Sequence, residues 1–418
     1  MTVGSQGFIV LVAALSVVFP LIPGVRARQI ALAAGSLSFL SLFVGNAASW
    51  LALAVFIGSG YLVARALQAR PRSGLFAAYL VALVGAFVWL KKYDFLAGLL
   101  PPVLLAHPLT VVGISYMLFR QIHFVVDSME QQIEGASPWT YLNYQLNLFA
   151  LLAGPIQRYN EFRESWDRLE PLPRHWRETA ALWIRILFGV MKMWGFGAAL
   201  LFVYEKCHER LISLARGSGG EGAGIVLILF AGLFVAYPLY MYANFSGYCD
   251  VAIGSACLFG LALPENFDRP YLSRNLIEFW TRWHRTLGFW IRDYLFIPLY
   301  RFVAGTWPGY AAGLAFLCYF VAFVIAGVWH GTSSNYFVFG LLHGVGTSAA
   351  KVWETLVIRR RGRAGFKTYL ASRPIRGIAI AGTMAYFALT MFFFADSLDG
   401  CFSILHVVGG AINGLGSP

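Results

Sequence analysis

Charged residues are scarce in this chain. Asp, Glu, Lys and Arg together make up 12% of its 418 residues, whereas hydrophobic residues make up 58%. A soluble domain carries about 25% charged residues, so the composition excludes an ordinary soluble fold and predicts a protein embedded in a lipid bilayer. The charges that remain are unbalanced, with 32 Lys and Arg against 20 Asp and Glu, which gives a net charge of +12. Because they lie between apolar runs, we expect them to face anionic membrane lipid, and we expect no nucleic-acid partner.

Cysteine is also rare and shows no paired spacing. An odd number of cysteines, most of them within apolar runs, predicts neither a disulfide framework nor a metal site. The chain also lacks the Gly-x-Ser-x-Gly and Cys-His patterns that supply a covalent nucleophile. No internal repeat and no boundary of a soluble domain is visible, so residues 1–418 are predicted to form one integral membrane domain. The five cysteines are Cys207, Cys249, Cys257, Cys318 and Cys401.

Apolar runs follow one another along the whole chain. A spanning helix needs roughly 20 apolar residues, and several runs are shorter, so we expect about ten to twelve helical membrane segments that include re-entrant and interfacial helices. Arginine clusters near Arg26, Arg70, Arg163 and Arg360 should face the cytoplasm. The sequence therefore predicts an all-α polytopic, multi-pass protein of the inner or plasma membrane. The runs are 8–22, 30–44, 50–66, 75–90, 109–126, 141–156, 180–204, 223–244, 246–263, 310–328, 335–350, 378–394 and 402–412.

Ionisable side chains in or next to two of these runs are candidates for a special role. His123 and Asp127 are four residues apart and would share one face of a helix, either as a functional pair or as a packed structural pair. The run 246–263 carries Asp250 and several glycines. We expect it to be re-entrant and to line a cavity in which protein or water satisfies that carboxylate.

Residues 275–300 form the most distinctive stretch. Helical periodicity separates an apolar, tryptophan-rich side from a side with Glu278 and three arginines, which predicts an amphipathic helix at the membrane interface. Asn275 can cap this helix together with Glu278, and Pro298 should end it. His284 falls within the apolar sector, either as a buried histidine bonded to a backbone carbonyl or as a residue with a chemical role. The apolar side comprises Trp280, Trp283, Leu287, Trp290, Ile291 and Tyr294, and the arginines are Arg282, Arg285 and Arg292.

A second histidine lies at a predicted helix end. His330 follows the uncharged run 310–328 and precedes polar, turn-forming residues 331–335. Such a place suits a water-poor cavity, where an imidazole with an ordinary pKa near 6.5 can act as a general base. A capped histidine with a purely structural role is the alternative.

These histidines belong to motifs that resemble those of the membrane-bound O-acyltransferase family. The resemblance is closest to the bacterial branch that holds the alginate O-acetyltransferase membrane subunit and the D-alanyl transfer protein of teichoic acid synthesis. Four motifs in sequence order are much more specific than any one alone. The motifs are Ala153-Gly154-Pro155-Ile156-x-Arg158; Phe245-Ser246-Gly247-Tyr248-x-Asp250 with Leu263-Pro264-Glu265-Asn266-Phe267; Phe279-Trp280-x-Arg282-Trp283-His284; and Gly327-x-Trp329-His330-Gly331.

The resemblance implies an enzyme that moves an acyl group, in the first instance acetyl, from a cytoplasmic thioester toward hydroxyls of an extracytoplasmic polysaccharide such as alginate. The donor would be an acyl-CoA such as acetyl-CoA, a substrate, so no cofactor is expected. In the D-alanyl branch the donor is an acyl-carrier protein and the acceptor is teichoic acid. The Ile297-Pro298-Leu299 sequence favours the acetylating branch. Because no serine motif is found, transfer is either direct or relayed to a periplasmic acyltransferase partner.

The resemblance also suggests roles for single residues. His330 would be the catalytic base, and His284 would position the donor or support the oxyanion. An alternative class, a transporter that moves an acyl group or a lipid without chemistry, would use similar intramembrane residues, but paired inverted repeats are not apparent. Further substrate contacts are expected from Trp283, Arg282, Arg285, Arg292, Asp293, Asp250, Asn266 and Trp329.

Overall fold

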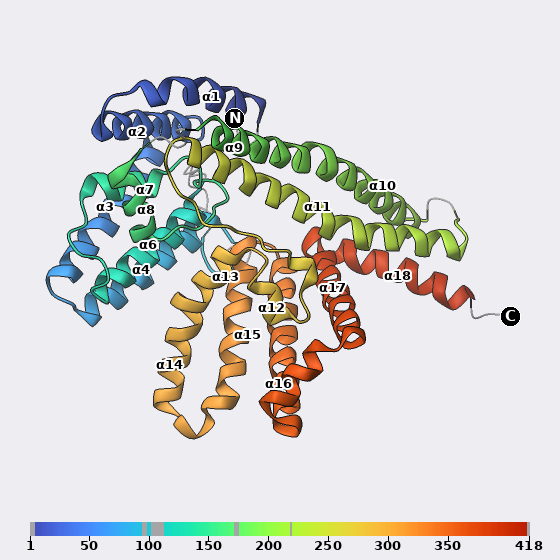
Figure 1. The fold of residues 1–418 in the computed structure, drawn as a ribbon. Helices are drawn as coiled ribbons and strands as arrows, with labels where there is room; N and C mark the ends of the chain where they lie inside the picture. Colours follow the sequence, from blue (N-terminus) through green and yellow to red (C-terminus); the bar gives the residue numbers. More distant parts are fainter. Residues whose placement is uncertain (1–4, 94–97, 102–112, 171–174, 218–219, 416–418) are drawn as a thin grey trace. The chain divides into compact units, whose positions relative to one another are not determined.

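The computed structural model describes residues 5–93, 98–101, 113–170, 175–217 and 220–415 (Figure 1). Throughout these residues the secondary structure is helical, without a β-strand, so the prediction of an all-α fold is confirmed. The chain divides into two compact units. Unit 1 combines Met1–Val190 with Tyr248–Asn266, and unit 2 combines Met191–Gly247 with Phe267–Pro418.

Unit 1 is organised around α6 (Ile114–Met129), which packs against α3 and α4. Arg120 on α6 is fully buried and donates hydrogen bonds to the backbone carbonyls of Tyr144, Gln145 and Ala150 at 2.9, 2.9 and 2.8 Å. These bonds hold the last turn of α7 and the segment after it against α6. The other helices are α1 (Gln6–Val18), α2 (Val25–Ser41), α3 (Ala47–Ala69), α4 (Ser73–Lys91), α7 (Pro138–Leu146), α8 (Tyr159–Arg168), α9 (Trp176–Val190) and the last turns of α11 (Ala223–Leu258).

His123 also serves this packing. The backbone N–H of Tyr159 donates to its Nε2 at 3.2 Å, and the hydroxyl of Tyr144 lies 2.9 Å from the same nitrogen. His123 is fully buried among these groups. Its contacts with α7 and α8 favour the structural role over the functional one.

Unit 2 contains the residues around His284 and His330. It begins with a π-helical segment (Met191–Gly197) and α10 (Ala198–Ala215), followed by most of α11. The remaining elements are a 3₁₀ turn (Pro270–Leu272), α12 (Leu276–Trp280), α13 (Arg285–Ile291), a π-helical segment (Arg292–Phe296), α14 (Ile297–Thr306), a 3₁₀ turn (Pro308–Tyr310), α15 (Ala311–His330), α16 (Ser334–Ala371), α17 (Arg373–Ala395) and α18 (Leu398–Leu415).

Within the described part of the chain, six helical stretches are long and apolar enough to cross a membrane. The chain is therefore a multi-pass membrane protein, as predicted, while the count of ten to twelve segments stays a prediction. The stretches are Ala47–Ala69, Ser73–Lys91, Trp176–Ala215, Ala223–Leu258, Gly313–His330 and Arg373–Ala395.

One expected boundary is wrong. The runs 223–244 and 246–263 were predicted as a span and a separate re-entrant segment, but α11 continues unbroken through Ser246 and Gly247 to Leu258. Serine and glycine are weak helix formers in water, yet membrane helices accommodate them readily. Asp250 and the glycines of the second run therefore did not indicate a separate segment.

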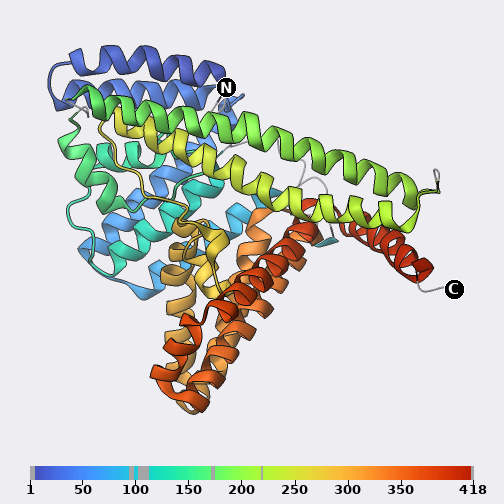
Figure 2. The same cartoon turned by 45° about the vertical axis from the view of Figure 1, so that its right-hand side comes forward.

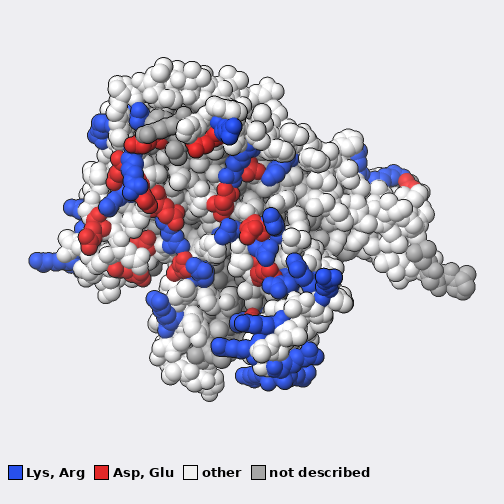
Figure 3. Space-filling view, viewed as in Figure 1, with Lys and Arg blue, Asp and Glu red and all other residues white. Residues whose placement is uncertain are grey.

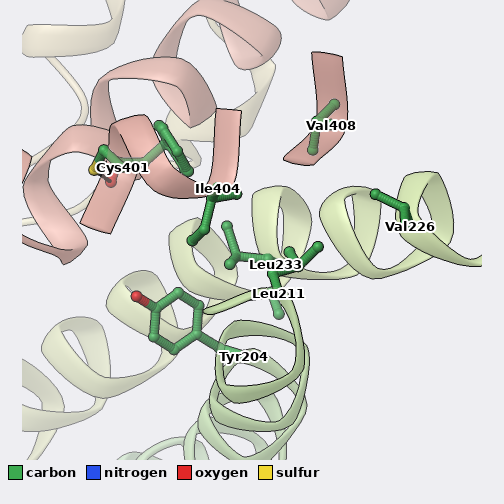
Figure 4. Close-up of a cluster of buried hydrophobic side chains, with 9 residues drawn as sticks. Tyr204, Leu211, Val226, Leu233, Cys401, Ile404 and Val408 are labelled. Carbon is green, nitrogen blue, oxygen red and sulfur yellow. Dashed lines mark hydrogen bonds between the residues drawn. The ribbon is translucent and has the colours of Figure 1, made fainter. Parts of the chain in front are cut away.

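The helices α10, α11 and α18 share an apolar core in unit 2 (Figure 4). Tyr204 and Leu211 of α10 meet Leu233 of α11 and Ile404 of α18, and all four side chains are buried. Next to this core, Nε2 of His208 lies 2.7 Å from a carboxylate oxygen of Asp396, which follows the end of α17. The apolar core and the polar contact together fix the C-terminal helix to α10.

The helices α15 and α16 run side by side (Figures 1 and 2) because glycines remove side chains where they meet. A Cβ at Gly340 would lie 2.6 Å from the carbonyl oxygen of Phe323 and 3.1 Å from the Cα of Gly327. Such close approach is possible only without a Cβ. The glycines therefore set the spacing of the hairpin that carries His330.

The far end of α16 is strongly basic. Figure 3 shows Lys and Arg side chains gathered there, next to the start of α17. Between Glu354 and Asp396 the sequence has no acidic residue. A basic segment next to an apolar helix is typical of a cytoplasmic membrane surface. This agrees with the cytoplasmic side predicted for Arg360, which stays a prediction. The basic residues are Arg359, Arg360, Arg361, Arg363, Lys367, Arg373 and Arg376.

Candidate functional site

The stretch 275–300 is not one helix, contrary to the prediction. Its first helix, α12, ends at Trp280, and α13 begins at Arg285 after His284, whose φ of 44° and ψ of 47° are left-handed. A left-handed residue cannot continue a right-handed helix. Pro298 does not end the stretch either, because the helical backbone runs on from α13 through the π-helical segment Arg292–Phe296 into α14, and Pro298 lies two residues after that segment.

The predicted cap and the predicted polar side are present. The Asn275 side chain accepts a hydrogen bond from the backbone N–H of Glu278 at 2.8 Å. The Glu278 carboxylate accepts from the guanidinium groups of Arg274 and Arg282, each at 2.8 Å. Burial alone would raise the pKa of Glu278, but the bonds and charges of these two arginines bring that pKa below its ordinary value. Arg282 is therefore held by Glu278, which fixes its direction.

The opposite side of the stretch is buried. Trp283 stacks on Phe279 with 5.6 Å between ring centroids and contacts Phe387 of α17 at 5.0 Å. Trp280, Leu287, Trp290 and Ile291 are buried as well. Although the helix is broken, the predicted division into an apolar and a polar side holds.

His284 lies inside this apolar packing and is 3% exposed. The ring of Phe245 meets it edge to face, with 4.7 Å between centroids. Burial lowers the pKa of His284 well below its ordinary value, and the charge of His330 lowers it further. His284 is thus a neutral imidazole near neutral pH.

His330 is the last residue of α15, so its predicted place at a helix end is confirmed. Its ring packs edge to face against Phe339 of α16 and Phe394 of α17, at 5.7 and 5.4 Å between centroids. Trp329 covers it from the preceding position at 4.8 Å. Unlike His284, His330 is only partly buried, so it combines an aromatic environment with a partly exposed ring.

The structure also brings a third histidine into the site, and it was not among the predicted site residues. Phe339 meets both His330 and His343, with 5.7 and 4.5 Å between ring centroids, and the charge of His330 acts on both His343 and His284. His343 on α16 is 1% exposed and accepts a hydrogen bond at Nδ1 from the Trp280 indole N–H at 3.3 Å. The three histidine side chains therefore form one group in unit 2, which we call the histidine cluster.

A small cavity lies next to the histidine cluster. It has a volume of about 130 Å³, and Trp280, Phe323 and Thr347 contribute to its mostly apolar lining, while Arg292 adds a charge. Arg292 also contacts Asp293, with 2.6 Å between Nε and a carboxylate oxygen. The cavity thus offers an apolar space with one cationic group.

The remaining predicted residues lie in different places. Arg285 lies over the ring of Phe289 within unit 2, 5.6 Å from its centroid. Asp250 and Asn266 belong to unit 1, where Asp250 contacts the Arg185 guanidinium at 3.0 Å and the Asn266 amide donates to the thiol sulfur of Cys249 at 3.5 Å. The predicted site residues are therefore divided between the two units.

Arg185 also binds Glu265 through two hydrogen bonds of 2.7 Å each. This arginine was not predicted as a partner of Asp250, because the two are far apart in sequence. All five cysteines of the chain are free thiols. Among the described residues, no group of three or more His, Cys, Asp or Glu side chains is arranged to hold a metal ion.

Comparison with known proteins gives consistent relatives. The chain is 28% identical over 303 residues to the teichoic acid D-alanyltransferase of Bacillus subtilis (strain 168). This match covers 70% of this chain and 71% of that protein. It is 31% identical over 251 residues to the probable alginate O-acetylase of Pseudomonas syringae pv. tomato. This match covers 59% of this chain but only 44% of that protein. The match thus spans less than half the length of this second relative.

The sequence pattern of the membrane-bound O-acyltransferase family matches residues 110–393, more than half of the chain. This range includes all three members of the histidine cluster and the residues of unit 1 around Arg120 and Asp250. The chain therefore belongs to the membrane-bound O-acyltransferase family.

Proposed function

We propose that this protein transfers an acyl group from a thioester to a hydroxyl group of an extracytoplasmic glycan. The observation that carries the proposal is the histidine cluster, in which a partly buried His330 at a helix end lies near two buried histidines. A general base must reach its substrate, whereas the groups that position the substrate work best in a dry environment. Burial of His284 and His343 with partial access of His330 fits this division.

In the proposed reaction, His330 removes the proton from the acceptor hydroxyl. The hydroxyl oxygen then attacks the thioester carbonyl, and the negative charge moves onto the carbonyl oxygen. When this intermediate collapses, the C–S bond breaks, the new ester remains, and the protonated His330 returns the proton to the leaving thiolate. The sequence of steps needs no cofactor and no metal.

His284 would position the donor. Its ring is buried against Phe245 and neutral, so it can offer a hydrogen bond without adding a charge to the apolar site. Arg282, Arg285 and Arg292 lie on the polar side of the same stretch, where they would attract the anionic part of a coenzyme A or acyl-carrier donor. Trp283 and Trp329 would shape the site through their packing. Asp250 and Asn266 lie in unit 1 and would contribute through their contacts within that unit.

The relatives support two acyl groups. One is named a teichoic acid D-alanyltransferase and the other a probable alginate O-acetylase. We favour acetyl transfer to a polysaccharide, because the Ile297-Pro298-Leu299 sequence resembles the acetylating branch. A periplasmic acyltransferase partner would accept the acyl group if transfer is relayed.

The test uses the purified protein in liposomes. Acetyl-CoA and a D-alanyl-loaded carrier protein are supplied in separate reactions, each with an alginate-type oligosaccharide or with teichoic acid, and thiol release and ester formation are measured. Thiol release from acetyl-CoA with ester on the polysaccharide supports the favoured reaction. Activity with the D-alanyl carrier and teichoic acid alone would instead establish the alternative. No thiol release from either donor would contradict an acyltransferase and favour transport without chemistry.

A further inference from the structure

His343 is bonded at one ring nitrogen and not at the other. Its Nδ1 lies 3.3 Å from Nε1 of Trp280, and the indole N–H can only donate. Nδ1 must therefore accept this bond and carries no proton, which places the single proton of the neutral ring on Nε2. Within the described residues, Nε2 is buried and has no hydrogen-bond partner. His343 thus presents an unused N–H donor inside unit 2.

A second unused polar group lies on the same face of α16. Thr347, four residues after His343, has a buried hydroxyl without a hydrogen-bond partner in the described part of the chain. Thr347 lines the cavity of about 130 Å³ together with Trp280 and Phe323. The ring of Phe323 also stacks against His343, with 6.1 Å between centroids. Thr347 thus lines the cavity itself, whereas His343 is not part of the lining and lies in contact with Trp280 and Phe323, which are.

Buried polar groups in native proteins nearly always have partners, because an unpaired donor destabilises the fold. Two such groups beside one cavity indicate a ligand that supplies the acceptor. The carbonyl oxygen of a thioester fits: it accepts hydrogen bonds, its surroundings are apolar, and its negative charge grows during acyl transfer.

We propose that His343 is a further catalytic residue, whose Nε2–H donates a hydrogen bond to the carbonyl oxygen of the acyl group as that oxygen becomes negative. Trp280 holds the ring in the required tautomer. This inference rests on the proposed acyl transfer and assigns the stabilisation of the oxyanion to His343, which leaves His330 as the base and His284 as the residue that positions the donor.

A packing role makes a different prediction. Phe339 meets His343 edge to face at 4.5 Å between centroids, so the histidine could simply fill space among aromatic rings. In that case His343→Phe should work as well as the wild type, since phenylalanine fills a similar volume. As an oxyanion donor, His343 cannot be replaced by phenylalanine, but His343→Gln, whose amide both accepts and donates, should restore part of the activity.

The first experiment measures turnover and thermal stability of purified variants in detergent. We expect His343→Phe to lower kcat by about 10²–10³-fold, as for loss of an oxyanion donor. The KM for the donor should rise by no more than about tenfold, the part of the bond that the neutral carbonyl already makes. The melting temperature should fall moderately, because the buried Trp280 N–H loses its acceptor. The double variant Trp280→Phe/His343→Phe removes both bonded groups and should recover most of that loss. His123→Phe is the matched control for stability: it removes a buried histidine with bonded partners and should lower the melting temperature clearly.

The second experiment needs no turnover. Binding of S-acetonyl-phosphopantetheine, which carries a carbonyl group, is compared with binding of S-propyl-phosphopantetheine, which does not. Phosphopantetheine is the arm common to coenzyme A and acyl-carrier proteins. The wild type should bind the carbonyl compound about tenfold more tightly, which corresponds to one good hydrogen bond, and His343→Phe should bind both alike.

The outcomes separate the two proposals. Wild-type turnover in His343→Phe, or an unchanged preference for the carbonyl compound in that variant, would overturn the role of His343 while acyl transfer stands. A joint loss of turnover, donor affinity and melting temperature that His343→Gln does not repair would show a structural histidine and would also overturn it. A wild type that binds neither compound and releases no thiol would refute the proposed function itself.

Discussion

The spacing of α15 and α16 can be perturbed at a single position. In Gly340→Ala the new Cβ would lie 2.6 Å from the carbonyl oxygen of Phe323, a backbone atom that cannot turn away. The two helices must separate, and such overpacking destabilises a protein by about 1–3 kcal/mol. Because His330 ends α15 and His343 lies on α16, the same separation should displace the two histidines, and misplacement by about 1 Å can reduce turnover 10²-fold.

The matched control is Gly382→Ala on α17, where a Cβ would meet nothing within 4 Å. There the added methyl group meets no neighbour, so the melting temperature should stay close to that of the wild type. Thermal unfolding of both purified variants in the same detergent, followed by thiol release in liposomes, gives the comparison. Equal melting temperatures and equal turnover for Gly340→Ala and Gly382→Ala would refute the close packing of α15 on α16.

Further predictions concern burial, acid and topology. His284→Gln should make thermal stability less sensitive to acid. In the folded wild type burial keeps His284 neutral, whereas the unfolded chain binds a proton at this residue below about pH 6.5. The free energy of unfolding of the wild type should therefore fall by up to about 1.4 kcal/mol per pH unit between pH 6.5 and 5. If the melting temperature of the variant fell with decreasing pH as much as that of the wild type, the burial of a neutral His284 ring would be contradicted. Arg120→Leu should destabilise the protein by about 3 kcal/mol or more, because three buried carbonyls lose a charged donor, and size-exclusion chromatography would then show aggregation. In a chain without native cysteines, Arg285→Cys and Arg360→Cys should resist an impermeant thiol reagent in intact cells, and ready labelling of the first would exclude the donor-side role of its helix.

Where the sequence signal is local, prediction and structure agree. His330 lies at a helix end because an uncharged apolar run is followed by Gly331 and polar residues, and both signals are visible in the sequence. The cap at Asn275 depends on residues three positions apart and is likewise local. The division of 275–300 into a buried and a polar side follows from helical periodicity, which survives the break because α12 and α13 keep their apolar residues on the core side.

Where tertiary contacts decide, the sequence was insufficient. The break at His284 has no glycine or proline in the sequence to indicate it, and the left-handed histidine is buried against Phe245, a residue distant in sequence. Asp250 meets Arg185 from another helix, so its partner cannot be read from spacing. His343 looks like an ordinary residue of an apolar run, and its unused Nε2–H becomes visible only once Trp280 is placed beside it.

The central claim is that His330 is the base of an acyl transfer. Its most direct test is donor affinity and turnover measured on the same purified, monodisperse His330→Ala variant, with thiol release from the thioester as the readout. The account predicts donor binding close to that of the wild type and turnover lower by about 10²–10⁴-fold, as for loss of a general base. Wild-type turnover in His330→Ala, or loss of donor binding without loss of the chemical step, would contradict it.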